Sequence, residues 1–406
     1  MPNVTGRFGP YAPPLVVGTP ALLAALYAWA VFVSTFSHPG VIGLNYNAPG
    51  SDWMVLYGAA HQALSGNLPL IFDGDRFTAY LNTAFAGWLT SPLEFRPWVY
   101  PPSFLVMLAP FEPLGFVGSY VAFQLVSAGL LAAALLYRAD RPAVAPWLAA
   151  AALLCPAAAV NAVDGQCSFL VAAILVAGFR LLGPRPLLAG LVLGILTFKP
   201  QFWLLVPVAL AAAGRWRTLA AAIASAAVLA AVSAAVFGPE SWAWWIRQTV
   251  ESYASADPKW VEFGRIWGNS VYACAVLLGV PAKAASLLQT AAILAAGAAV
   301  FAAFRSRMAA DLKLALLLVA TILGAPHSAS YDVVLLVVAA GLWLAAGPGP
   351  PSLLRWIVAL AFWLSAMFSP PALSVPGRFT PLLLAGFIGI VLYRNWRGLD
   401  AEPRAL

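Results

Sequence analysis

Charged side chains are scarce in this sequence, since Asp, Glu, Lys and Arg make up only 9% of its 406 residues. In soluble globular domains, about a quarter of the residues are charged. Apolar residues instead reach 62%, and the mean hydropathy is +0.85. The surplus comes in runs of Ala, Leu and Val, each long enough to cross a bilayer. This composition excludes a soluble domain and predicts a polytopic membrane protein.

Cysteine and histidine are also rare, with three residues of each. The cysteines lie in or beside apolar runs and form no CxxC pair, so the sequence supports neither a disulfide framework nor a zinc site. No HxxH, HExxH, GxSxG or Walker pattern occurs. We therefore expect no metal and no cofactor.

Basic residues outnumber acidic ones by 22 to 15, which gives a net charge of +7. A basic protein can bind nucleic acid, but here the distribution follows the membrane pattern instead. Fourteen of the 22 basic residues fall in alternate loops or tails: Arg7, Arg138, Arg141, Arg180, Arg185, Arg215, Arg217, Arg305, Arg307, Lys313, Arg355, Arg394, Arg397 and Arg404. Such loops face the cytoplasm. We expect both termini on the cytoplasmic side of the cell (inner) membrane, the lipid bilayer as a partner, and no nucleic-acid partner.

The apolar runs predict an all-α transmembrane bundle of about ten to thirteen spans, folded as one domain over residues 1–406. The first run, Leu15–Phe36, is too long for the apolar part of a signal peptide and predicts an uncleaved span. Prolines interrupt the block after Pro102 and the stretch around Pro200, so broken or re-entrant segments are expected there. The other predicted spans lie near Ala143–Val160, Ser168–Leu182, Leu187–Thr197, Phe202–Ala213, Leu219–Phe237, Ala284–Phe304, Leu312–Leu323, Val333–Ala346, Trp356–Phe368 and Leu382–Tyr393.

Two long polar intervals, residues 37–102 and 238–269, fall on the side opposite the basic loops. The first contains apolar residues at helical spacing, which predict a helix from Ser51, as its N-cap, to a stop near Gly66. These residues are Trp53, Leu56, Tyr57, Ala60 and Leu64. We expect an amphipathic helix that lies on the outer membrane surface.

Asp52 lies in the first turn of that predicted helix. A carboxylate at the membrane rim can act as a general base for a hydroxyl group; the alternative is a solvated Asp stabilised by the helix dipole. The predicted topology brings further polar residues to the same rim: Tyr100, Asp164, Gln166, Lys199, His327, Tyr331 and Asp332. Because the bilayer disfavours such residues, their gathering favours a functional site.

Lys199 follows a long apolar stretch and precedes Pro200 and Gln201, so it marks a helix break at membrane depth. An unpaired ammonium there costs about 2.5–3.5 kcal/mol on insertion scales, and an anion should offset that cost. The functional interpretation is that Lys199 binds a lipid phosphate. The alternative is that its long side chain reaches the interface.

Two further polar turns interrupt the apolar runs. Asp164-Gly165-Gln166 is either a simple turn or an amide donor that faces a sugar or phosphate. In the turn from Pro326 to Asp332, His327 can donate to a phosphate or orient a carboxylate. The alternative is an interfacial turn in which Tyr331 is an anchor.

The second outer interval, 238–269, is aromatic and carries both signs of charge. Its tryptophans are Trp242, Trp244, Trp245, Trp260 and Trp267. They form either an interfacial belt or, in part, a cover over an acceptor sugar.

The ordered motifs resemble glycosyltransferase family 87, whose members are membrane enzymes. The similar segments are Ser51-Asp52-Trp53, Tyr100-Pro101-Pro102, Asp164-Gly165-Gln166, Arg185 to Gln201, Gly214 to Arg217, Pro326-His327 and Tyr331-Asp332. One departure is Asp164, which stands where the family usually has Asn.

The resemblance implies a GT-C fold, a polyprenyl-phosphate sugar donor and a lipid or glycan acceptor, with mannose or a related sugar transferred. It implies that Asp52 is the catalytic base and that Lys199 and His327 lie near the donor phosphate. The expected substrate-binding residues are Trp53, Tyr100, Asp164, Gln166, Gln201, Tyr331 and Asp332.

A transporter or flippase is the alternative class, because transport sites also use broken helices with polar residues at membrane depth. The long first polar interval and the absence of an internal repeat favour the enzyme.

Overall fold

The computed structural model describes residues 12–37, 49–89, 91–254, 258–265, 268–346, 351–368 and 374–397. Within these ranges the regular structure is entirely helical, which confirms the predicted all-α fold. Arg7, Arg404 and the remainder of both terminal tails lie outside the described residues.

The helices follow in chain order. They are α1 Ala12–Ser37, α2 Ser51–Leu64, α3 Leu68–Ile71, α4 Gly74–Ala84, α5 Pro102–Leu108, α6 Gly115–Leu136, α7 Ala145–Leu154, α8 Pro156–Asp164, α9 Ser168–Leu181, α10 Pro186–Ile195, α11 Pro200–Trp203, α12 Val206–Ala212, α13 Trp216–Phe237, α14 Glu240–Ala254, α15 Pro258–Arg265, α16 Val271–Leu277, α17 Ala282–Arg305, α18 Ala310–Gly324, α19 Val334–Ala345, α20 Leu353–Leu364 and α21 Thr380–Trp396. Short 3-10 helices occur at Ala109–Leu114, Leu196–Phe198, Ser365–Phe368 and Pro376–Phe379.

Five helical segments in the described part are long and apolar enough to cross a membrane, or six if one bent pair counts as a single span. Five shorter apolar helices of 10–17 residues accompany them. The predicted number of ten to thirteen spans stays a prediction, because it requires the shorter helices to cross the bilayer as well.

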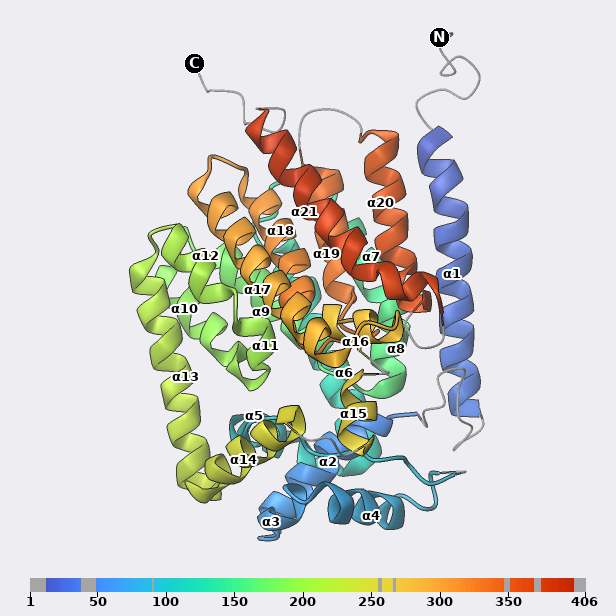
Figure 1. Cartoon of the computed structure of the whole chain (residues 1–406), viewed down its shortest axis with the longest axis vertical. Helices are drawn as coiled ribbons and strands as arrows, with labels where there is room; N and C mark the ends of the chain where they lie inside the picture. Colours follow the sequence, from blue (N-terminus) through green and yellow to red (C-terminus); the bar gives the residue numbers. More distant parts are fainter. Residues whose placement is uncertain are drawn as a thin grey trace.

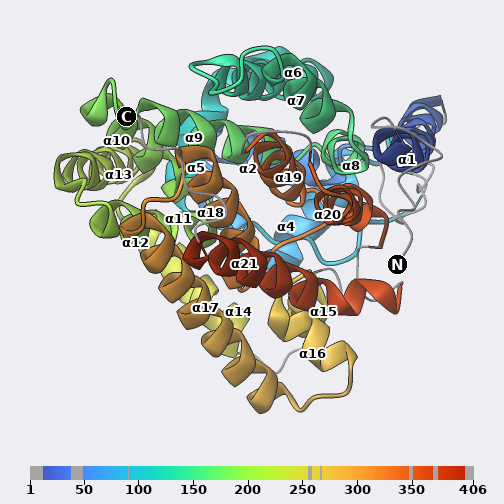
Figure 2. The same cartoon turned by 90° about the horizontal axis from the view of Figure 1, so that it is seen from above.

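The centre of the bundle is formed by α18 and α19, whose residues are almost all buried (Figure 2). The helices around them expose large apolar side chains, such as Leu125 on α6, Val228 on α13 and Leu294 on α17. An exposed apolar surface of this kind is stable in contact with lipid rather than with water.

The predicted breaks occur, and one predicted span is itself divided. The helix after Pro102 is interrupted at Ala109–Leu114, and the chain leaves the helix between Phe198 and Pro200. The expected span Ala143–Val160 consists of α7 and α8, bent by 51° at Cys155. Pro156 follows the bend, and its ring nitrogen cannot donate the hydrogen bond that would continue α7. The bend directs the end of α8 toward α2.

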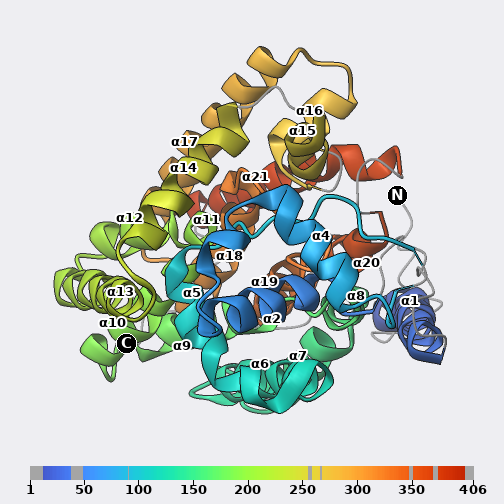
Figure 3. The same ribbon diagram turned by 90° about the horizontal axis from the view of Figure 1, so that it is seen from below.

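The helix of the first polar interval, α2, has nearly the predicted bounds, but it is buried within the protein instead of exposing a polar face along its length. Nine residues of α2 are buried, because α5 and α6 pack against it and Phe77 and Leu81 of α4 cover it as well. Figure 3 shows α2 across the centre of this end of the molecule. The N-cap is Gly50 in the left-handed conformation rather than Ser51, which is buried in the first turn.

The two ends of the molecule differ in character. Helices α2, α3, α4, α14 and α15 lie at one end, and α1 begins and α21 ends at the other (Figure 1). At that other end, Arg180 of α9 donates to the carbonyls of Leu135 and Tyr137 and lies 3.7 Å from Asp311 of α18. Basic loops that are far apart in the sequence therefore meet at one end.

Candidate active site

The first turn of α2 is fixed against the end of α8 and against α6. The Gly50 amide donates to the Val163 carbonyl at 2.6 Å. The Trp53 indole donates to the Ser119 hydroxyl at 3.1 Å, and its ring centre lies 4.9 Å from that of Phe123. These contacts hold α2 beside the turn between α8 and α9.

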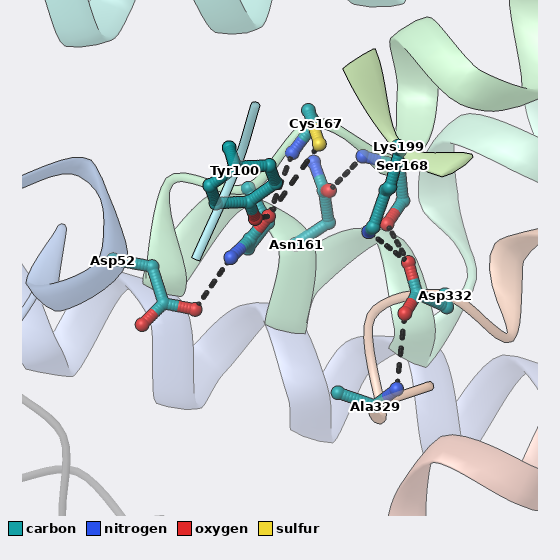
Figure 4. A network of polar contacts seen from close by, with 9 residues as sticks. Asp52, Tyr100, Asn161, Cys167, Ser168, Lys199, Ala329 and Asp332 are labelled. Carbon is teal, nitrogen blue, oxygen red and sulfur yellow. Dashed lines mark hydrogen bonds and ion pairs between the residues drawn. The ribbon is translucent and has the colours of Figure 1, made fainter. Parts of the chain in front are cut away.

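Gln166, in that turn, connects Asp52 with Tyr100. Its Nε2 donates to Asp52 Oδ2 at 2.7 Å, and its Oε1 accepts from the Tyr100 hydroxyl at 3.2 Å (Figure 4). The Cys167 amide donates to the same Oε1 at 3.2 Å. Because Oε1 has two donors, the amide group is oriented with its own donor toward the Asp52 carboxylate.

Lys199 was expected to find its anion in a lipid phosphate, but a carboxylate of the protein itself lies beside it. Its Nζ lies 2.8 Å from Asp332 Oδ1, and both side chains are almost fully buried. Asp332 also accepts from the Ser168 hydroxyl at 2.9 Å and from the Ala329 amide at 3.0 Å (Figure 4). The partner carboxylate comes from a turn that is distant in the sequence, so the Lys199 charge is offset inside the protein.

Aromatic rings flank the Lys199 ammonium. Its Nζ lies 4.8 Å from the centre of the Phe202 ring and 5.4 Å from that of Tyr331. Such cation–π contacts add to the stabilisation of a desolvated charge. Tyr331 is therefore part of the Lys199 environment rather than an interfacial anchor remote from it.

The turn between α8 and α9 joins the Asp52 and Lys199 parts into one network. Gln166 contacts Asp52, and Ser168, two residues further on, contacts Asp332. Asn161 stabilises this turn, since its Oδ1 accepts from the Ser168 amide at 3.0 Å. Its Nδ2 in turn donates to Gln124, whose own amide donates to the Gln166 carbonyl.

Asn161, Ser168 and Gln124 were not among the residues predicted from the sequence. A signal was present for Asn161, because it is an amide within the Ala-rich stretch from Ala157 to Val163. A buried amide in an apolar helix must find hydrogen-bond partners, which makes it a candidate for a structural network.

His327 lies in the turn between α18 and α19 and stacks on Phe263 of α15, with ring centres 6.0 Å apart and planes 14° from parallel. Burial lowers the pKa of His327, an effect that the nearby Asp332 carboxylate opposes. The imidazole is therefore neutral at pH 7, and it can donate one hydrogen bond without carrying a charge.

Three predicted substrate-binding residues are placed differently. Trp53 is 1% exposed and packs in the core at the base of α2. Asp164 is the last residue of α8 and is buried. Gln201 lies on α11, partly exposed, and takes part in none of the hydrogen bonds of the network within the described ranges.

The second polar interval forms α14 and α15 at the same end of the molecule. Trp245 donates to the Val99 carbonyl at 3.2 Å, and Trp260 meets the Phe95 ring edge to face at 4.9 Å. Both contacts are to the segment that leads to Tyr100. Trp267 lies outside the described residues.

In the described part of the chain, no three His, Cys, Asp or Glu side chains come together to hold a metal ion. The site instead combines a carboxylate oriented by an amide with a buried ammonium–carboxylate pair, and the His327 imidazole lies in the same turn as the Asp332 of that pair. These groups can accept a proton from a hydroxyl and donate hydrogen bonds to an anionic leaving group.

Fold and network together define an all-helical membrane protein with a polar site at one end of its bundle. Residues 98–326, more than half of the chain, match glycosyltransferase family 87. The chain belongs to this family and is a membrane glycosyltransferase. The matched region contains Tyr100, Gln166 and Lys199, whereas Asp52 and Asp332 lie outside it and reach the site by folding. No curated protein and no solved structure matches the sequence.

Proposed function

We propose that this glycosyltransferase moves a sugar, mannose or a related hexose or pentose, from a polyprenyl-phosphate donor to a lipid or glycan acceptor. The observation that carries the proposal is the placement of the Asp52 carboxylate. It is held by Gln166 in the same network as the buried ammonium of Lys199. A base and a phosphate-binding cation are the two groups that this transfer needs.

In the proposed reaction, Asp52 takes the proton of the acceptor hydroxyl, and the resulting oxygen attacks the anomeric carbon of the donor sugar. The bond from that carbon to the phosphate oxygen breaks, and polyprenyl phosphate leaves with the electron pair. A single displacement of this kind inverts the anomeric configuration. General-base assistance contributes about 10²–10⁴-fold to such a step, and positioning of the two substrates supplies the rest.

Lys199 and His327 are the proposed contacts of the donor phosphate. An ammonium has three N–H donors, and Lys199 directs one of them at Asp332. Its remaining donors and the neutral imidazole of His327 can stabilise the charge that develops on the leaving oxygen. Asp332, on this proposal, holds the ammonium in place while it does so.

The orientation of the chain supports a lipid-linked donor. We propose that the basic end faces the cytoplasm, with both termini there, and that the Asp52 end faces outward from the cell (inner) membrane. Nucleotide sugars are made in the cytoplasm, so a site on the outer face needs a donor that the membrane itself carries.

The test is a transfer assay with full-length protein in lipid nanodiscs and a native lipid extract as acceptor. Radiolabelled polyprenyl-phosphate mannose should yield a labelled product, whereas nucleotide-activated mannose should yield none in the absence of a lipid carrier. Direct use of the nucleotide donor would contradict the proposal. Translocation of the labelled lipid across vesicles without a new glycosidic bond would instead favour the flippase.

A further inference from the structure

A hollow apart from the Asp52 network is lined by residues from the end of α3 and from α14. Both helices lie at the same end of the molecule as α2 (Figure 1). Its volume is about 230 Å³, and its lining includes Phe72, Asp73, Trp244, Arg247, Gln248 and Glu251. Sites for drug-sized ligands run from about 300 to 1,000 Å³. This hollow is smaller, so it has room for a single ring rather than for a whole lipid-linked glycan.

Gln248 is the unusual member of this lining. Its side chain is 7% exposed, yet neither its amide oxygen nor its amide nitrogen has a hydrogen-bond partner among the described residues. Gln289, buried to the same degree, accepts from the Tyr272 amide and donates to the Gly324 carbonyl. A buried amide without partners is unfavourable, and a ligand in the hollow would supply both a donor and an acceptor.

The rest of the lining indicates the chemistry of that ligand. The rings of Phe72 and Trp244 are 5.8 Å apart and tilted by 49°, which gives the hollow an apolar wall. Asp73 and Glu251 supply two carboxylates against the one guanidinium of Arg247. A lining with net negative charge disfavours a phosphate, whereas the carboxylate oxygens of Asp73 and Glu251 can accept hydrogen bonds from hydroxyl groups.

We propose that this hollow binds a neutral sugar unit of the acceptor glycan. A sugar ring has an apolar C–H face for Phe72 and Trp244, and it has hydroxyl groups that both donate to and accept from the Gln248 amide. The inference rests on the proposed function only in assigning the bound sugar to the acceptor rather than to the donor.

The hollow is connected to the catalytic network through short structural links. On one side, α3 follows α2, the helix that carries Asp52. On the other side, Trp245 of α14 donates to the carbonyl of Val99, the residue before Tyr100. A sugar bound between α3 and α14 is thus held by elements that adjoin α2, which carries the proposed base, and the segment before Tyr100.

Direct binding tests this inference without any donor. Wild-type protein in nanodiscs is titrated with methyl glycosides of mannose, glucose and arabinose, and with inorganic phosphate, by saturation-transfer NMR. We expect at least one neutral glycoside to bind and phosphate not to bind. Q248L should weaken glycoside binding about tenfold, the loss expected when one or two hydrogen bonds disappear.

The Q248L variant also distinguishes a loss of glycoside binding from a loss of folding. Leucine fills a similar volume and removes the unpaired amide, so Q248L should unfold at the same temperature as wild type or higher. W244A should weaken binding as well, and W147A is the matched control, since Trp147 on α7 is 76% exposed and remote from the hollow.

Two results would overturn the inference: a wild-type protein that binds no neutral glycoside, or a Q248L variant that binds as tightly as wild type. In either case Gln248 holds no more than a buried water. The Asp52→Asn variant should bind the glycosides normally. A failure of the lipid-linked donor in the transfer assay would therefore count against the proposed function while leaving this binding site intact.

Discussion

At the scale of the residue, Gln166 shows how one amide group can orient a carboxylate. Its acceptor end is occupied by Tyr100 and the Cys167 amide, so its donor end must face Asp52. Among the residues that the structure describes, no hydrogen-bond donor lies on the other carboxylate oxygen of Asp52. It is the oxygen that we expect to receive the proton of the acceptor hydroxyl.

Asp52→Asn should lower turnover by about 10²-fold or more without changing the temperature of unfolding. The Asn oxygen still accepts from Gln166, but the amide cannot take up a proton. The lost interaction with the helix dipole is worth only about 0.3–1 kcal/mol, which is too little to unfold the bundle. Initial rates with the lipid-linked donor, together with thermal unfolding in detergent, measure both effects. Normal turnover in this variant would move the search for the base to Asp332 or Asp164.

Lys199→Met should destabilise the fold by about 3–5 kcal/mol, because it leaves the Asp332 carboxylate buried without its cation. Adding Asp332→Asn should recover most of this stability, since Asn can keep the bonds from Ser168 and Ala329 without a charge. Both the single variant and the double variant should bind the donor phosphate more weakly than wild type, because both lack the Lys199 ammonium. Denaturant unfolding and donor titration separate the two effects. A stable single variant would show that the pair is not an ion pair in solution.

At the scale of the element, the contact between α2 and the turn from α8 to α9 sets the geometry of the site. Gly165, in this turn, has a φ of 75°, and a Cβ there would lie 2.5 Å from Trp53 Cβ and 2.9 Å from the Tyr120 ring. No other residue fits at this position without displacing the helix that carries Asp52.

Gly165→Ala should therefore cost about 1–3 kcal/mol and reduce turnover, because α2 must move away from Gln166. Gly214→Ala is the matched control. Gly214 has a similar φ of 66°, but nothing lies within 4 Å of a Cβ built there, so only backbone strain remains. Thermal unfolding and initial rates of both variants give the comparison. Equal effects of the two substitutions would show that the contact with Trp53 is unimportant.

Local patterns explain which elements could be predicted from the sequence. The helix Ser51–Leu64 follows from its own periodicity, and the breaks near Pro110 and Pro200 follow from the lost amide hydrogen, whereas the break at Pro156 was not predicted. The burial of this helix, α2, could not be predicted in this way, because the residues that cover it, Phe77 and Leu81, come from another segment, α4.

Local sequence patterns also do not predict which side chains from distant segments pair with each other. Lys199 and Asp332 are 133 residues apart, and each was predicted as a site residue without its partner. The alternation of basic loops predicted that polar residues gather at the outer rim of the membrane, and the side of the membrane stays a prediction. Which of these polar residues touch depends on how α8, α9 and α18 pack, and no local signal specifies that packing.

At the scale of the whole molecule, the two ends carry different kinds of residues. One end gathers basic loops, with Arg180 beside Asp311. The other end holds α2, which carries Asp52, together with α14 and α15 (Figure 1). The bundle between them exposes apolar side chains to lipid. This division supports one fixed orientation in the membrane and hence one side for the reaction.

Cysteine labelling tests that orientation. Ser65→Cys, at the exposed end of α2, should react with an impermeant maleimide in intact cells, and Arg217→Cys, at the exposed start of α13, should react only after permeabilisation. Background should be low, since Cys155, Cys167 and Cys274 are all buried. Ser51, although closer to Asp52, is unsuitable because it is fully buried. The reverse labelling pattern would place Asp52 on the cytoplasmic side, where nucleotide sugars are available, and the orientation would then no longer support a lipid-linked donor.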